Sequence, residues 1–287
     1  MSVAQIAGGA VPAAARRAAK RDWMFLTALA VFAIIAVAAL FGSWLAPYDA
    51  NELYAGPVNG APSLAHPFGT DDLGRDILSR VLVGAQASVF APVLVVILST
   101  LMGVALAVTG AWFGGWVSGG IARLIDVIFA IPGLVIAVLA VAMFGKGLIA
   151  PIVALSIAYI PIVARLTQTA AARELGMPYM AALRIQGVSQ LAICFRHLLP
   201  ALVPIVAAQM AVAFGYAMLD LAAISFLGLG QQPPAPDWGS MIASGQAGIL
   251  AGAPEQSVFP AILVVITVLA VGIIGARVTD WAEEKER

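Results

Sequence analysis

The chain has 287 residues, of which 62% are hydrophobic and 10% are charged, and its mean hydropathy is +0.99. Soluble domains carry about 45–50% apolar and about 25% charged residues, so this composition excludes a soluble enzyme, a secreted disulfide scaffold and a disordered chain. Fifteen basic residues balance fifteen acidic ones, and zero net charge argues against a nucleic-acid partner. We therefore predict an all-α polytopic membrane protein.

Six stretches are long and apolar enough to cross a bilayer, because a helix spanning about 30 Å of hydrocarbon needs about 20 mostly apolar residues. In chain order they are 23–45, 88–112, 121–144, 148–166, 198–227 and 258–276. The first exceeds the apolar core of a signal peptide, and no convincing cleavage site follows it, so we interpret it as a retained anchor. The glycine-rich residues 113–120 predict a tight turn between the second and third spans.

The basic residues predict the orientation, because cytoplasmic loops are enriched in Lys and Arg. With the N-terminus inside, the outer side holds only Arg75, Arg80 and Lys146, and the inner side holds the other twelve of the 15 basic residues. We therefore expect both termini to be cytoplasmic.

The first outer loop, residues 47–87, is acidic and is expected to end in a short interfacial helix. Thr70 can cap such a helix, and Asp71 and Asp72 suit its first turn. Apolar residues then follow at four-residue spacing: Leu73, Ile77 and Val81.

Two further connections are too long to be simple turns. The inner stretch 167–197, of about thirty residues, is rich in helix formers, and a loop of this length is usually functional. The outer stretch 228–257 begins with several prolines, and its later part, Met241–Leu250, is apolar enough to dip into the membrane surface.

Motifs for enzymatic chemistry are absent from the sequence. There is no phosphate-binding P-loop and no zinc-protease motif, and His66 and His197 fall on opposite sides of the membrane. The hydroxyls of Ser156 and Ser225 have no histidine at the same depth, and Cys194 is interpreted as an apolar filler. We predict no catalytic residue, no metal site and no cofactor.

Two acidic residues fall inside predicted spans, where an ionisable group is costly and therefore a functional candidate. Asp126 follows Arg123 by three residues, which favours a local ion pair. Asp220 has no such neighbour and is a candidate gate or pathway residue.

Three motifs resemble those of one family. Residues 179–187 (YMAALRIQG), followed after nine residues by 197–200 (HLLP), resemble the "EAA" loop in the membrane subunits of ABC importers. Residues 66–76 (HPFGTDDLGRD) and 225–230 (SFLGLG) resemble motifs of the C-type permease subunit of the dipeptide/oligopeptide/nickel family. Further matching segments lie at 45–49, 232–234 and 238–239. The family commonly carries Glu where this chain has Leu221, so no family role is carried over to Asp220.

This resemblance implies a type I ABC importer-like transmembrane domain in the bacterial cytoplasmic (inner) membrane. The implied segments are a basic cytoplasmic tail (1–22), a first helix (23–46), the outer loop (47–87), a five-helix core (88–278) and a second tail (279–287). The implied partners are a second homologous permease, two cytosolic ATP-binding subunits, an extracytoplasmic substrate-binding protein and the lipid bilayer.

The resemblance also assigns site residues. A helix around Met177–Leu191, entered through Pro178 and broken by Gly187, is expected to dock on an ATPase subunit, with Ala182 and Leu183 as apolar contacts. The coupling-loop residues implied are Tyr179, Ala182, Leu183, Arg184, Gly187, His197, Leu199 and Pro200. The motif that faces the binding protein, or that holds the outer loop in place, comprises Gly69, Thr70, Asp71, Asp72, Gly74, Arg75 and Asp76.

The cargo is the least determined feature. Peptides are the commonest cargo of the family, and nickel or another small solute is the alternative. A single-chain secondary transporter is a further alternative, but such proteins usually show an internal repeat, and we find none between residues 23–144 and 148–276. A membrane enzyme needs buried acid–base groups that the sequence does not provide.

Overall fold

A computed structural model describes the backbone of residues 13–285 and the side chains of residues 22–281. Parts of both predicted tails, residues 1–12 and 286–287, therefore lie outside the described residues. Within the described range the chain is helical, and the only β pairing is an isolated bridge between Thr70 and Asp76. The long helices are α1 (Ala13–Leu45), α2 (Ile77–Phe113), α5 (Ile149–Leu175), α8 (Leu199–Phe226) and α11 (Glu255–Lys285).

Five helical segments are long and apolar enough to cross a membrane, and the number is six if one bent pair of helices counts as a single span. This arrangement confirms the predicted all-α polytopic class. The third span, however, is not the single helix expected: α3 (Gly115–Phe129) and α4 (Gly133–Phe144) meet at 76°. Pro132 lies at this break as the N-cap of α4, and its ring prevents the helix from continuing through it. The predicted glycine-rich turn is also shorter than expected, because α3 already begins at Gly115.

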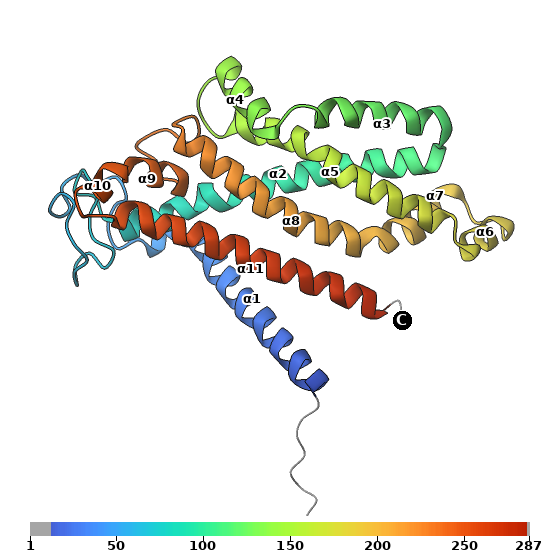
Figure 1. The fold of residues 1–287 in the computed structure, drawn as a ribbon, viewed down its shortest axis with the longest axis horizontal. Coiled ribbons are helices and arrows are strands. Elements are labelled where there is room, and N and C mark those ends of the chain that lie inside the picture. The colour runs from blue at the N-terminus through green and yellow to red at the C-terminus, as the bar shows by residue number, and fades with distance from the viewer. Residues whose placement is uncertain (1–12, 286–287) are drawn as a thin grey trace, which may run out of the picture.

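α2 lies at the centre of the bundle and packs along α5, with α8 and α1 on its other sides (Figure 1). α2 and α5 approach closely at Gly103, where an added Cβ would lie 2.8 Å from the Cβ of Val163. Small residues permit such close helix contacts in membranes. An apolar cluster joins α2, α4, α5 and α8, and it includes Val95, Leu155 and Ile224.

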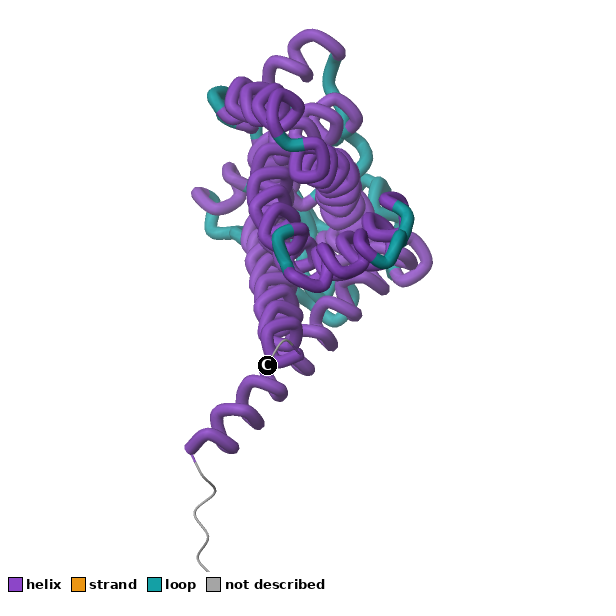
Figure 2. The backbone as a smooth tube through the Cα atoms, turned by 90° about the vertical axis from the view of Figure 1, so that its right-hand side faces the viewer, coloured by secondary structure: helices purple, strands orange, loops and turns teal. Residues whose placement is uncertain are grey.

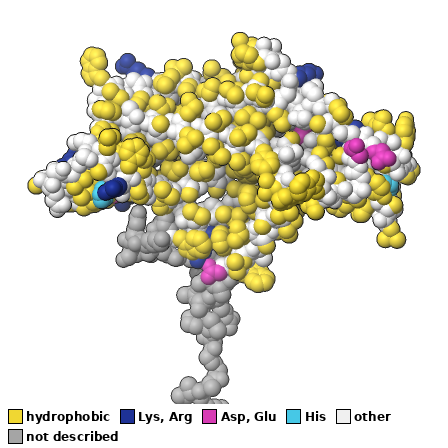
Figure 3. Space-filling view, turned by 180° about the vertical axis from the view of Figure 1, so that it is seen from behind, with side chains coloured by type: hydrophobic (Ala, Val, Ile, Leu, Met, Phe, Trp, Pro, Cys, Tyr) yellow, Lys and Arg dark blue, Asp and Glu magenta, His cyan; other side chains and the backbone are white. Residues whose placement is uncertain are grey.

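α1 packs on α2 and α11 and crosses the bundle at an angle, so that its N-terminal end extends beyond the other helices (Figures 1 and 2). Its apolar side chains are largely exposed: Trp23 is 69%, Ile34 70% and Trp44 85% exposed. Apolar side chains also cover most of the middle of the face shown in Figure 3. Water would not stabilise such a surface, so the helices are suited to contact lipid or partner subunits.

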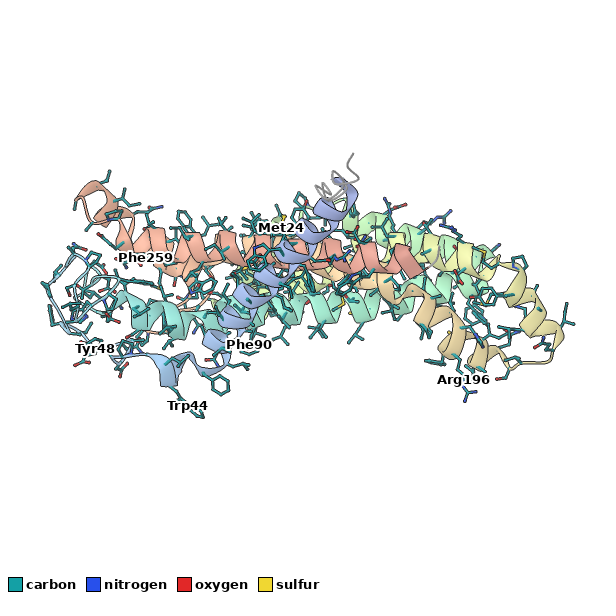
Figure 4. The ribbon with its side chains drawn as sticks, turned by 90° about the horizontal axis from the view of Figure 1, so that it is seen from below. Met24, Trp44, Tyr48, Phe90, Arg196 and Phe259 are labelled. Atoms are coloured by element: carbon teal, nitrogen blue, oxygen red, sulfur yellow. The ribbon has the colours of Figure 1, made fainter. Side chains whose placement is uncertain are left out.

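The connections separate to the two ends of the bundle (Figure 1). We call the end with the 46–76 loop the loop end and the other end the α6 end. The loop end also holds α9 (Trp238–Ser244) and α10 (Gln246–Leu250), and the α6 end holds α6 (Pro178–Ile185), α7 (Gln190–Ile193) and the π-helical turn η1 (Cys194–Leu198). Figure 4 shows Tyr48 at the loop end and Arg196 at the α6 end.

Within Met241–Leu250, Met241 is fully buried, whereas Ile249 and Leu250 are 48% and 92% exposed. The apolar character of the start of this segment therefore reflects packing against the core rather than contact with the membrane.

Candidate functional site

The α6 segment is shaped by proline at its start and glycine after its end. Met177 is an extended N-cap and Pro178 occupies the first turn, where a missing N–H costs nothing. After Ile185 the chain reverses at Gly187, which has φ +78°, and the N–H of Val188 bonds to the carbonyl of Leu183. The helix is shorter than the expected Met177–Leu191, because the chain restarts as α7 with Ser189 as its N-cap.

The α6 segment is fixed to the bundle by a small core of its own. Met180 is fully buried and packs in a cluster with Ala171 of α5, Ile193 of α7 and Leu202 of α8. Leu183 packs against the same cluster. Leu183 is only partly buried, so its side chain helps to hold α6 against α5 and α8, and its contact with a partner stays a prediction.

The side chains that do project were not all expected. Ala182 and Arg184 are exposed, as is Ile185, which is 87% exposed. Beyond the turn, Leu191 and Phe195 are 72% and 65% exposed. Large exposed apolar side chains beside charged ones are typical of protein interaction sites. Sequence reasoning missed Ile185, although an isoleucine next to Arg184 at the tip of a polar loop was a visible signal.

Tyr179 links α6 to the end of α5. Its side chain is 42% exposed, and its hydroxyl donates a hydrogen bond to the carboxylate of Glu174. Partial burial, together with this hydrogen bond, raises the pKa of Tyr179 to about 12. The phenol thus stays protonated and keeps α6 tied to α5.

The other expected coupling residues lie nearer the bundle. His197 lies in η1, Leu199 begins α8, and Pro200 occupies the first turn of α8. Leu199 and Pro200 line an apolar cleft of about 490 Å³ with Val104 of α2. These residues connect the α6 segment to α8; His197 and Leu199 are partly buried, and Pro200 is exposed.

At the loop end, the expected interfacial helix is replaced by a tight loop. The carboxylate of Asp71 accepts hydrogen bonds from the backbone N–H groups of Leu73 and Arg75, both at 2.9 Å, and Gly74 has φ +70°. Side-chain bonds of this kind compete with helix formation, which explains the difference. Thr70 is no helix cap: it accepts from the N–H of Gly60 and donates to the carbonyl of Pro57.

The charges of this loop neutralise one another in the interior. Asp71 is fully buried, its Oδ2 lies 2.6 Å from Arg75 Nε, and Arg80 Nε lies 3.6 Å from the same oxygen. Arg80 also donates to the carbonyl of Ala50 at 2.9 Å. Of the three expected acids, only Asp72 is exposed.

Asp76 is the true N-cap of α2. Its carboxylate accepts from the backbone N–H and hydroxyl of Ser79, both at 2.7 Å, and lies 3.0 Å from His66 Nδ1. Gly69 has φ +78°, and a Cβ there would lie 2.4 Å from the carbonyl oxygen of Gly60. Together with the bonds of Thr70 and Arg80, these contacts hold residues 66–80 against residues 50–60 of the same loop.

The two acids within the spans have different partners. Asp126 of α3 pairs with Arg165 of α5, not with Arg123 as expected, because α3 lies alongside α5. Arg165 also lies over the ring of Phe129, 5.3 Å from its centroid. Asp220 of α8 accepts a hydrogen bond of 2.7 Å from the hydroxyl of Tyr159 in α5.

Matches to known proteins cover most of the chain, and they are to membrane components of transport systems. Residues 99–287 match the family described as binding-protein-dependent transport system inner membrane component, and residues 13–65 match the N-terminal transmembrane domain of oligopeptide transport permease C. The glutathione transport system permease protein GsiD of Shigella flexneri serotype 5b is 41% identical, over 93% of this chain and 88% of that protein. Its counterpart in Escherichia coli O6:K15:H31 is 39% identical over the same shares.

The fold also resembles a solved transporter. An inward-facing structure of the MetNI methionine ABC transporter superposes with a TM-score of 0.54 at 18% identity, covering 69% of this chain and 94% of that chain. A second structure of that transporter gives a TM-score of 0.53 at 19% identity, covering 72% and 96%. The likeness concerns the fold of the transmembrane region.

Proposed function

The chain belongs to the binding-protein-dependent transport system inner membrane component family and is a permease subunit of an ABC importer, and we propose that its cargo is a short peptide. Two findings support this cargo. The relatives with 39–41% identity are named for transport of glutathione, a tripeptide, and residues 13–65 match an oligopeptide permease domain. Nickel or another small solute carried by the same machinery is the alternative. Family membership favours the importer over a single-chain secondary transporter.

The protein is a multi-pass protein of the inner membrane. An importer permease implies ATPase and binding-protein partners. In our proposal this chain and a second homologous permease enclose the path, two cytosolic ATPase subunits supply the energy, and an extracytoplasmic binding protein delivers the cargo. We assign no catalytic residue and no cofactor to this chain, and we propose that both of its termini are cytoplasmic.

The observation that carries the coupling role is the α6 segment. It is held to α5 and α8 through buried Met180, yet it leaves Ile185 87% exposed. In the proposal, Ile185 enters an apolar groove on an ATPase subunit, with Ala182 and Arg184 beside it. ATP-driven movement of that subunit is then transmitted to α5 and α8, because the α6 core joins both helices.

Replacing Ile185 by Asp in the reconstituted importer tests this role, with Gln186→Asp as the matched control at the neighbouring exposed position. A central apolar contact is worth about 2 kcal/mol or more, so we expect cargo uptake to fall at least about tenfold in the first variant. The control should retain most of its uptake. Normal cargo-stimulated ATP hydrolysis and uptake in Ile185→Asp would show that the α6 tip does not dock on the ATPase.

A further inference from the structure

Asp220 and Tyr159 form a polar contact between two helices that are otherwise packed through apolar side chains. The phenol hydroxyl of Tyr159 donates to Asp220 Oδ2 at 2.7 Å, and Tyr159 is only 7% exposed. The ring of Tyr159 belongs to the apolar cluster that also holds Ala217 and Leu221 of α8. One carboxylate oxygen of Asp220 is therefore held in a fixed position.

The carboxylate of Asp220 lacks a basic partner within the part of the chain that the structure describes. No Lys, Arg or His side chain there lies within 4.0 Å of it, whereas Asp126, the other acid in the spans, pairs with Arg165. An ionisable group in a membrane-spanning segment is costly and is usually balanced by an opposite charge. Asp220 thus lacks a balancing cation from residues 22–281, whose side chains the structure describes.

The surface beside Asp220 is open in the isolated subunit. Tyr216, one turn earlier on α8, is 59% exposed, and Leu219 is 49% exposed. Asp220 itself is partly exposed. A carboxylate bordering lipid would be unfavourable, so this face of α8 is suited to a water-containing path or to a partner subunit.

We propose that Asp220, positioned by Tyr159, binds the ammonium group of the cargo on its way through the membrane. A carboxylate is the strongest acceptor for an ammonium donor, and the faces of aromatic rings such as Tyr216 attract cations. Tyr159 is a positioning residue, because its hydroxyl holds Asp220 Oδ2 and leaves the other oxygen for the ligand. The identity of the cargo as a peptide rests on the proposed function, whereas the cation site does not.

Infrared difference spectroscopy tests the cation site directly. The assembled importer in lipid nanodiscs is exposed to ethylammonium, and the carboxylate bands are compared before and after addition. We expect a band shift in the wild type and in Asp72→Asn, whose carboxylate is exposed at the loop end, and no such shift in Asp220→Asn. The inference is wrong if the wild type shows no band shift, or if Asp220→Asn shows the same shift as the wild type.

Uptake by the reconstituted importer with its binding protein tests the role in transport. Trialanine is compared with propionyl-dialanine, which has the same shape without the amino group. Asp220→Asn should lower trialanine uptake about tenfold or more and leave propionyl-dialanine uptake unchanged, because only the first cargo loses a charged hydrogen bond. Tyr159→Phe should lower trialanine uptake by a smaller factor while sparing the analogue.

Equal losses for the two cargoes would contradict a cargo site and assign Asp220 to a cation of the partner permease. If the wild type carries neither peptide, the proposed peptide cargo is wrong, and the infrared measurement still decides whether Asp220 binds an ammonium ion.

Discussion

The two ends of the bundle both expose large apolar side chains, such as Leu250 at the loop end and Ile185 at the α6 end, but they differ in where their charged residues lie. At the loop end, Asp71, Asp76 and Arg80 are at most 5% exposed and satisfy one another or nearby backbone. At the α6 end, Ile185 and Leu191 are 87% and 72% exposed. Buried charges hold a loop in one arrangement, whereas exposed apolar side chains have no stabilising contact until a partner covers them. The buried charges therefore give the loop end its internal order, whereas the α6 end, which exposes Arg184 and Arg196 beside these apolar side chains, is suited to docking.

The largest effect should follow from breaking the charge network of the loop end. Asp71→Ala leaves Arg75 and Arg80 buried without their shared carboxylate, and removing one partner of a buried pair typically costs about 3–5 kcal/mol. The matched change Asp72→Ala affects an exposed carboxylate and should cost less than about 1 kcal/mol. Equilibrium unfolding of the purified chain in mixed micelles measures both. Equal losses of unfolding free energy would contradict the internal role of Asp71.

A smaller effect is expected from straining the turn after α6. Gly187 has φ +78°, and no atom lies within 4 Å of the Cβ that a substitution would add. Gly187→Ala therefore strains the native turn by about 1–2 kcal/mol without a clash. A cost of this size lowers the population of the native turn, relative to other conformations, by a factor of about 5–30, and the α6 tip moves with it.

The measurable result is a loss of cargo uptake at unchanged membrane levels, with Gln186→Ala as the control. Full uptake by Gly187→Ala would show that the position of the tip does not matter for coupling. If the variant protein is instead lost from the membrane, the turn is needed for folding, as the charge network of the loop end is.

The smallest effect concerns the link between α6 and α5. The pKa of Tyr179 is raised to about 12, so its protonated phenol stabilises the fold below about pH 10, and this contribution is lost as the pH rises from about 10 to 12. The ultraviolet titration of the wild type should contain a tyrosine ionisation near pH 12 that Tyr179→Phe lacks. At neutral pH the variant should transport almost normally, because Met180 still holds α6. If Tyr179→Phe instead lacks a tyrosine ionisation near pH 10, the hydrogen bond from Tyr179 to Glu174 does not form.

The sequence predicted the spans well because their apolar character is a local property, but it did not predict which apolar side chains are covered. Leu183 and Ile185 look alike in sequence, and only the packing of α6 on α5 and α8 partly covers Leu183 and leaves Ile185 exposed. The same limit applies to Asp126, whose partner Arg165 lies on a different helix. The positions of Pro178 and Gly187 did predict the start and the break of α6, because proline and glycine act on the backbone of their own segment.

The loop end was mispredicted for a related reason. Thr70 and the acids after it fit a helix start in sequence, yet the following backbone N–H groups donate to the carboxylate of Asp71, and together with the left-handed Gly74 they produce a loop. The cap falls instead at Asp76, where His66 from the distant side of the loop approaches its carboxylate.

The central claim is that the α6 end lies in the cytoplasm and meets the ATPase. The test uses two single-cysteine variants, Ile185→Cys and Leu64→Cys, each made in a Cys194→Ser background. Leu64 is fully exposed at the loop end. Each variant is treated with a membrane-impermeant thiol reagent. We expect Ile185→Cys to react only in inverted vesicles and to be protected by bound ATPase subunits. Leu64→Cys should react only in right-side-out vesicles. Labelling of Ile185→Cys from the outside would contradict the central claim.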